Sequence, residues 1–222
     1  MRAIIFVLCL MPSVCAFAQF NPDLFITLNG NLFIPVESAD RMFPIVGFNK
    51  ELKPKLLIGG FGVGFAGQKM ISGKFSLKTQ GTFFRKAYWQ QYLFRRGPLL
   101  SDIVGEATVS TFDYTMGAAA IPHFHFSRAF SVGVGVGLHA LLFSNSYLRQ
   151  DLTADGNRNL GRNRYYKSFM PIVPFETSLR LSRWAVNVRY EHALLNRFKG
   201  NLADYKKEKY GLLFFELGYK IN

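Results

Sequence analysis

The stretch that decides the fold is Gly73–Lys86, which reads GKFSLKTQGTFFRK. Apolar and polar residues alternate along it, with Phe75, Leu77, Thr79 and Phe83 on one face and Lys74, Ser76, Lys78, Gln80 and Thr82 on the other. Because successive side chains of a β-strand point to opposite faces, this period predicts a strand with one apolar and one charged face. Such a strand is typical of a membrane barrel, in which lipid-facing and lumen-facing positions alternate.

The same alternation recurs in seven further segments, which are residues 24–34, 56–66, 111–126, 130–143, 172–181, 184–192 and 211–222. After Gln19, no run of 18 uninterrupted apolar residues occurs, which argues against transmembrane helices. The sequence therefore predicts an all-β chain of eight strands.

The connections between these segments alternate strictly in length. Three are short, at Gly67–Ser72, Ser127–Arg128 and Ser182–Arg183, and four are long and polar, at Pro35–Lys55, Ala87–Ser110, Ser144–Lys167 and Ala193–Lys209. A soluble sandwich or lipocalin-like barrel also uses alternating strands, but its apolar face points inward and its loops are not sorted in this way. We therefore expect a single eight-stranded antiparallel transmembrane β-barrel, with short periplasmic turns, long extracellular loops and both mature termini on the periplasmic side.

The first residues have the pattern of a secretory signal peptide. Arg2 precedes a short apolar run, and Ala16-Phe17-Ala18 forms a cleavage signal before Gln19. The run is too short for a membrane anchor, and the residues before Cys15 match a lipoprotein signal poorly. The expected organisation is a signal peptide over 1–18, cleaved between Ala18 and Gln19, and an outer-membrane barrel domain over 19–222.

Composition restricts the functional classes. Both cysteines, Cys9 and Cys15, lie in the signal peptide, so the mature chain has no disulfide, thiol nucleophile or thiolate metal site. Without Arg2, 26 basic residues stand against 14 acidic ones, a net charge of +12. A basic balance favours an anionic partner, but export and the lack of a nucleic-acid-binding motif argue against nucleic acid.

The charged positions of the strands must point into the lumen, because a charge facing lipid costs ~2–4 kcal/mol at the bilayer midplane. Eight strands enclose a space that side chains fill, and buried charges are expensive unless they pair. A charged lumen has two interpretations, a packed plug and a narrow pore for ions or small solutes, and the size of the barrel favours the plug. The predicted network of lumen ion pairs consists of Lys74, Lys78, Asp113, Glu176, Arg180, Arg189, Glu191, Glu216 and Lys220.

Aromatic and basic residues outside the lumen suggest contacts with lipid. Aromatic side chains at the short-turn end, at Phe130, Trp184 and Tyr219, would anchor at the inner interface. At the outer end, Tyr88, Trp89, Tyr92, Tyr165, Tyr166 and Tyr210 would do the same or belong to the loops. The long loops carry clusters of Arg and Lys, such as Arg95-Arg96 and Lys206-Lys207. These bases either contact phosphorylated lipopolysaccharide or simply keep the loops solvated.

The histidines offer little for catalysis. His123 and His125 share a strand face, but no cluster of further ligands lies near them in the sequence, and we expect no metal or other cofactor. His192 has the position of the base in lipid A deacylases, whose element is His-x-Ser-Asn. Here Leu194 replaces the nucleophilic serine, so the required hydroxyl is missing. We therefore expect no enzymatic activity and no catalytic residue, with a lipid A-modifying enzyme as the weakest alternative.

The chain resembles the small outer-membrane β-barrel (porin-family, PorT-like) proteins of Bacteroidota. The resemblance rests on the signal ending Ala18-Gln19, the eight segments, the element Arg189-Tyr190-Glu191 followed by Leu194-Leu195-Asn196, and the closing strand. It covers the mature chain, although the terminal Asn222 replaces the Phe common in proteobacterial barrels. The resemblance implies a non-enzymatic structural or accessory role, insertion by the barrel-assembly machinery, and for some members a link to secretion-system or envelope partners.

Overall fold

A computed structural model describes residues 22–37, 49–53, 59–96, 102–150, 157–162, 167–196 and 209–222. The predicted signal peptide and its cleavage site lie outside these residues. None of the described residues forms a helix long and apolar enough to cross a membrane. The strands are β1 (Asp23–Glu37), β2 (Asn49–Lys53), β3 (Gly60–Ser72), β4 (Phe75–Arg96), β5 (Asp102–His125), β6 (Phe130–Val134), β7 (Val136–Gln150), β8 (Asn157–Arg162), β9 (Phe169–Leu181), β10 (Trp184–Ala193) and β11 (Lys209–Lys220).

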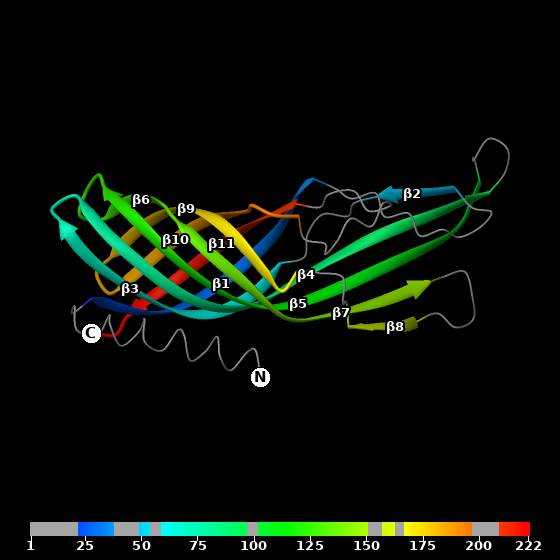
Figure 1. The fold of residues 1–222 in the computed structure, drawn as a ribbon, viewed down its shortest axis with the longest axis horizontal. Helices are drawn as coiled ribbons and strands as arrows, with labels where there is room; N and C mark the ends of the chain where they lie inside the picture. Colours follow the sequence, from blue (N-terminus) through cyan, green and yellow to red (C-terminus); the bar gives the residue numbers. More distant parts are fainter. Residues whose placement is uncertain are drawn as a thin grey trace.

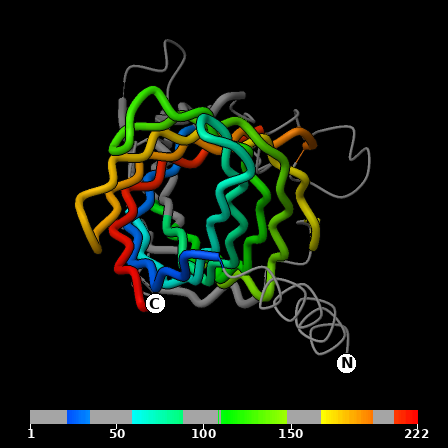
Figure 2. The backbone as a smooth tube through the Cα atoms, turned by 90° about the vertical axis from the view of Figure 1, so that its left-hand side faces the viewer, coloured from blue at the N-terminus to red at the C-terminus, as the bar shows by residue number. Residues whose placement is uncertain are grey.

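The strands close into an antiparallel barrel. Its order is β1, β3, β4, β5, β6 with β7, β9, β10 and β11, and β11 pairs with β1 to complete the ring. The view along the barrel shows this ring directly (Figure 2). The first and last strands are in register from Phe25 opposite Lys220 to Ile34 opposite Gly211. The predicted eight-stranded antiparallel barrel is therefore confirmed, since closure leaves every ring strand a neighbour on both sides.

One ring position is shared by β6 and β7, which both pair with β5 and β9 and flank Gly135. A Cβ atom at Gly135 would overlap the Ala120 carbonyl oxygen, so only glycine permits this approach of the two backbones. Farther along β7, the register against β5 shifts at Tyr114 and Thr115. Leu142 lies at this bulge and not at a regular outward position, and Phe143 is the exposed residue there.

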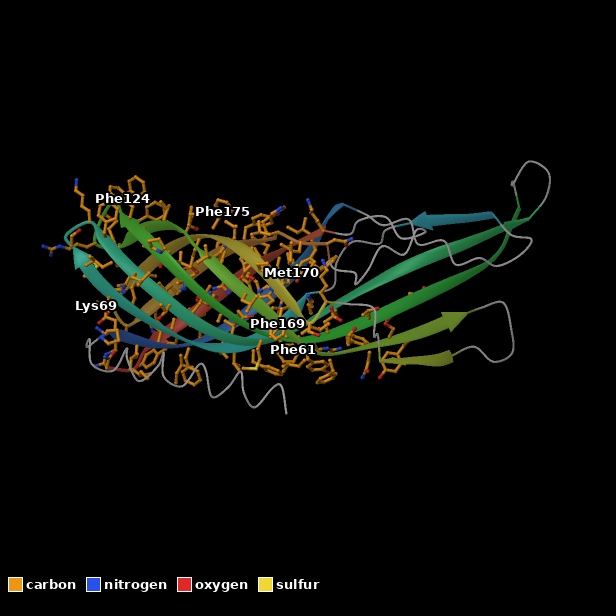
Figure 3. All side chains as sticks on the ribbon, viewed as in Figure 1. Phe61, Lys69, Phe124, Phe169, Met170 and Phe175 are labelled. Carbon is orange, nitrogen blue, oxygen red and sulfur yellow. The ribbon has the colours of Figure 1, made fainter. Side chains whose placement is uncertain are left out.

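The two faces of the wall have opposite chemistry. Along β10, Trp184, Val186 and Val188 are exposed, whereas Ala185, Asn187 and Arg189 are buried. The same alternation orients β9, where Phe175 is 46% exposed and Met170 is 4% exposed, and both are labelled in Figure 3. The exterior is therefore apolar and the interior mostly polar, as the sequence pattern predicts. An exterior of this kind suits lipid and not water.

The structure corrects several predicted boundaries. Residues 67–72 belong to β3, and the turn is formed by Gly73 and Lys74. The predicted loop Ala87–Ser110 is largely strand, because β4 and β5 pair as far as Arg96 opposite Asp102. Two of the other three long gaps, Pro35–Lys55 and Ser144–Lys167, contain β2, which pairs with β4, and β8, which pairs with β7. Figure 1 shows these strands extending far beyond one end of the barrel. Their apolar and polar residues alternate too weakly for the two-residue period to predict them.

The short turns and the two described chain ends share the opposite end of the barrel (Figure 1). Asn222 ties these ends together, since its side chain accepts a hydrogen bond from Leu24 N at 2.8 Å and donates one to Pro22 O at 2.8 Å. We call this the short-turn end and the other the long-hairpin end.

Candidate functional site: a charged layer in the lumen

A layer of buried charges crosses the middle of the barrel, and Arg189 lies at its centre. The Arg189 side chain is inaccessible to solvent. Its Nε lies 2.8 Å from Glu191 Oε1, and its Nη1 lies 3.3 Å from Glu176 Oε2 and 3.1 Å from Glu216 Oε2. Three carboxylates from β9, β10 and β11 thus surround one guanidinium. The β-strand period places them there, because all four residues occupy inward positions.

Lys78 of β4 closes the layer from the other side of the barrel. Its Nζ donates to Glu176 Oε1 at 2.7 Å and to Glu216 Oε1 at 3.1 Å. Asn187 also donates to Glu216 Oε1, at 2.8 Å. The structure thus brings five of the nine predicted lumen residues into one network, namely Lys78, Glu176, Arg189, Glu191 and Glu216. Because both cations share carboxylates, removing one group leaves the others buried with fewer partners.

Two histidines join this layer, and sequence reasoning did not place them in it. His139 Nε2 lies 2.7 Å from Glu191 Oε2, and His123 Nε2 lies 3.3 Å from Glu176 Oε1. His123 Nδ1 also contacts Ser131 Oγ at 3.1 Å. The two-residue period of the strands could have indicated both histidines, since they occupy inward positions of β5 and β7. Their imidazole rings extend the network of Glu176 and Glu191 to β5 and β7.

An apolar layer packs against the charged layer on its long-hairpin side, which the predicted polar lumen did not include. It contains Phe33, Phe84, Met170, Ile172, Ala193, Tyr210, Leu212 and Phe214. The two layers are joined at Phe214, whose ring centroid lies 4.6 Å from the Arg189 guanidinium carbon. Phe84 packs edge-on against both Phe214 and the His139 ring. Aromatic rings thus cover the charges from one side and exclude water from them.

Glycines in β3 make room for polar side chains of the neighbouring β1. A Cβ at Gly62 would lie 2.8 Å from Asn29 Oδ1 and 2.5 Å from the Phe84 Cβ, and a Cβ at Gly64 would lie 2.8 Å from Thr27 Oγ1. Both approaches are closer than a Cβ atom tolerates. The glycine row therefore allows Thr27, Asn29 and Phe84 to share the narrow interior.

Asp113 and Lys86 form a separate pair nearer the long-hairpin end. Lys86 Nζ lies 3.7 Å from Asp113 Oδ2 and 4.3 Å from the centroid of the Tyr210 ring. Asp113 was predicted in the lumen network, whereas Lys86 was not assigned. Tyr210 was expected to be an outer aromatic anchor or a loop residue, but it lies in β11, is 3% exposed and points inward. A cavity of about 10 Å³ lies beside this pair, also lined by Thr115 and His139.

The remaining three predicted lumen residues lie at the short-turn end. Arg180 Nη1 lies 3.1 Å from Asp23 Oδ2, and Lys220 pairs with the same carboxylate, so Asp23 is a residue that the prediction missed. Arg180 and Lys220 are about 30% exposed and form the mouth of the barrel. Lys74 is wrong as a lumen residue. It is exposed in the Gly73–Lys74 turn, because β3 extends farther than its alternation predicts.

The other two histidines lie away from the charged layer. His125 lies at the short-turn end and contacts Ser76 Oγ at 2.8 Å, separate from His123. His192 is partly exposed on the outward face of β10, with its Nδ1 3.3 Å from the Tyr190 hydroxyl. Within the described part of the chain, no three His, Cys, Asp or Glu side chains are arranged to hold a metal ion. The side chains of Tyr88, Trp89, Tyr92, Tyr165 and Tyr166 lie outside the description.

Comparisons with models of protein families and with curated protein sequences found no match. Among solved structures, the chain is similar to the attachment invasion locus protein Ail of Yersinia pestis, with 12% identity, 90% of this chain and 99% of that chain covered, and a TM-score of 0.42. It is also similar to Neisserial surface protein A, with 10% identity, coverage of 89% and 97%, and a TM-score of 0.42. The outer membrane protein OprG of Pseudomonas aeruginosa gives 12% identity, coverage of 90% and 97%, and a TM-score of 0.36. At these values the fold assignment rests on the strand pairing of this chain itself.

Proposed function

We propose that this chain is a non-enzymatic β-barrel protein of the cell outer membrane whose lumen is closed by an ion-paired plug. The observation that carries the proposal is the contrast between the two faces of the wall. Leu28, Phe65 and Phe215 are 51–67% exposed on the outside, whereas Arg189 and Glu176 are excluded from solvent inside. Contact between an apolar exterior and lipid acyl chains has no free-energy cost, whereas contact between the same surface and water is unfavourable.

We propose that packed side chains close the lumen of the barrel. The charged layer and the apolar layer are stacked along the barrel, and both contain side chains without solvent exposure, such as Arg189, Phe84 and Phe214. The cavity beside them, at about 10 Å³, has room for about one water molecule. A packed interior of this kind supports a structural or accessory role and not the transport of solutes. The alternative function is a narrow pore.

Planar-bilayer recording separates these two functions. The refolded full chain should insert without discrete conductance steps, and its insertion is checked by its migration on unboiled and boiled gels. The double variant Arg189→Ser with Phe214→Ser removes the centre of both layers and should raise the conductance, which shows that the assay detects an open lumen. Discrete channels in the unmodified chain would refute the plug and support the pore.

The orientation and the partners belong to the same proposal. The short turns and both mature termini face the periplasm, and the long hairpins face outward toward lipopolysaccharide. Antiparallel barrels of the outer membrane have this asymmetry of connections. The barrel-assembly machinery inserts the chain. In an accessory role the barrel binds a secretion-system or envelope protein, as the PorT-like resemblance implies. Copurification from native membrane is the measurement. If a variant without residues 87–110 no longer copurifies with an envelope partner, that partner binds at the hairpin of β4 and β5.

We also propose the absence of enzymatic activity. His192 points outward beside Tyr190, and the hydroxyl that a lipid A deacylase requires two residues later is replaced by Leu194. Lipid A isolated after overexpression should keep its acyl chains, as measured by mass spectrometry. Loss of an acyl chain that depends on His192 would contradict the proposal.

A further inference from the structure

Each of the three short turns carries one exposed base. Lys74 lies in the β3–β4 turn, Arg128 in the β5–β6 turn and Arg183 in the β9–β10 turn. The strand pairing gathers these turns at one end of the barrel, although they are far apart in the sequence (Figure 1). Among the described residues of this end, Asp23 has the single acidic side chain, and its carboxylate already pairs with Arg180 and Lys220. The turn bases therefore form a ring of positive charge.

Exposed apolar side chains flank every one of these bases. Ile71 is 69% exposed and Phe75 51% exposed beside Lys74. Phe126 is 64% exposed beside Arg128, and Trp184 is 46% exposed beside Arg183. Strand ends and turns that face water rarely expose a group of large apolar side chains together, since such a patch gains from being covered. A base next to an exposed aromatic or aliphatic group is the pattern of residues at a membrane–water interface.

The aromatic groups at this end also contact one another. Phe126 packs edge-on against Phe124 at 5.0 Å and lies 5.8 Å from Phe130, measured between ring centroids. Trp184 packs against Tyr219 at 4.9 Å. Figure 3 labels Phe124 and Lys69 at this end of the barrel. These rings form an apolar band directly behind the ring of bases.

We infer that the short-turn end is an interaction surface for anionic phospholipid head groups, with Lys74, Arg128 and Arg183 binding lipid phosphates. The apolar band lies at the boundary of the acyl chains, so the turns sit at head-group depth and do not project into the periplasm. Each base near an anionic lipid surface favours the anionic over the neutral lipid by roughly fivefold. An acidic protein partner would use the same charges, but it would not explain the flanking apolar residues. The inference rests on the proposed membrane location.

Quenching of Trp184 fluorescence by brominated lipid tests the surface. Trp89 lies in β4 toward the long-hairpin end, and Trp89→Phe leaves Trp184 as the one tryptophan. The refolded full chain is placed in vesicles of equal phosphatidylglycerol and phosphatidylcholine, with the bromine on one lipid or on the other. We expect brominated phosphatidylglycerol to quench several-fold more effectively, which measures its enrichment next to Trp184.

The triple variant Lys74→Gln, Arg128→Gln and Arg183→Gln should lose this enrichment. The matched control removes three bases at the other end of the molecule, by Lys50→Gln, Lys53→Gln and Arg158→Gln in β2 and β8, and should keep it. Equal quenching by both lipids in the unmodified barrel, or enrichment that persists in the triple variant, would overturn the inference and leave the membrane location standing. Quenching by neither lipid would overturn the membrane location as well. Heat-modifiable migration shows that each variant is folded.

Discussion

Arg189 of β10 and Glu176 of β9 face each other at directly paired backbone positions, with their Nη1 and Oε2 atoms 3.3 Å apart and neither side chain exposed. A cross-strand pair of this kind is the unit from which the charged layer is built. The antiparallel register fixes the distance between the two backbones, and β11, which pairs with β10, adds Glu216. Closure of the barrel adds Lys78 from β4, a strand that is remote in the sequence. The layer therefore depends on the register and on closure together.

Replacing Arg189 should cost much of the barrel's stability. Arg189→Met leaves three buried carboxylates with one partner fewer, and a broken buried pair costs ~3–5 kcal/mol. The measurement is urea-induced unfolding of the refolded barrel in lipid vesicles. Arg183→Gln is the control, since this exposed turn base contributes less than ~0.5 kcal/mol. Equal unfolding free energies for the two variants would contradict the role assigned to the layer.

The glycines of neighbouring strands should respond differently to the same substitution. Gly62→Ala should lower the free energy of unfolding by ~1–3 kcal/mol, because its Cβ would collide with Phe84 and Asn29 in the lumen. Gly30→Ala, on the outward face of β1, has no atom within 4 Å of the new Cβ. It should leave stability unchanged or slightly raised. If both variants lost a comparable free energy of unfolding, strand propensity and not collision in the lumen would determine the effect of the substitution.

A charge on the outer face should hinder folding into the bilayer. Val188→Lys places an ammonium group on the exposed face of β10, next to the exposed Phe215 of β11. The expected cost is up to ~2–4 kcal/mol. The folded fraction in vesicles is read from migration on an unboiled gel. Ala129→Lys, in an exposed turn, should fold like the unmodified chain. If Val188→Lys folds equally well, the exterior does not face lipid.

The β9–β10 turn should be improved by glycine. Ser182 has a φ of 56° and is the one non-glycine residue with positive φ among those described. Two-residue hairpin turns with positive φ at their first central position favour glycine there. Ser182→Gly should therefore raise the unfolding free energy by ~0.4–1 kcal/mol, measured by urea unfolding. Ser127→Gly is the control and should not stabilise. A destabilised Ser182→Gly would show that the serine side chain itself is needed.

The sequence by itself determined the eight strand positions of the ring, the inward or outward direction of most side chains and the sharing of one end of the barrel by the short turns. These properties are local: a period of two assigns Lys78 and Phe75 to opposite faces wherever the strand is placed. It could not give the end of β3, because Gly67–Ser72 contains no clear alternation, and Lys74 was therefore misassigned. The strands beyond the barrel were missed for the same reason.

Only the tertiary structure decided which inward residues meet. Arg180 and Arg189 are both inward on neighbouring strands, yet one pairs with Asp23 at the mouth and the other lies at the centre of three carboxylates. The height of a residue in a barrel depends on the stagger of the strands at closure, which brings β4 of the first half opposite β9 and β11 of the second. The apolar layer at Phe84 and Phe214 follows from that long-range geometry.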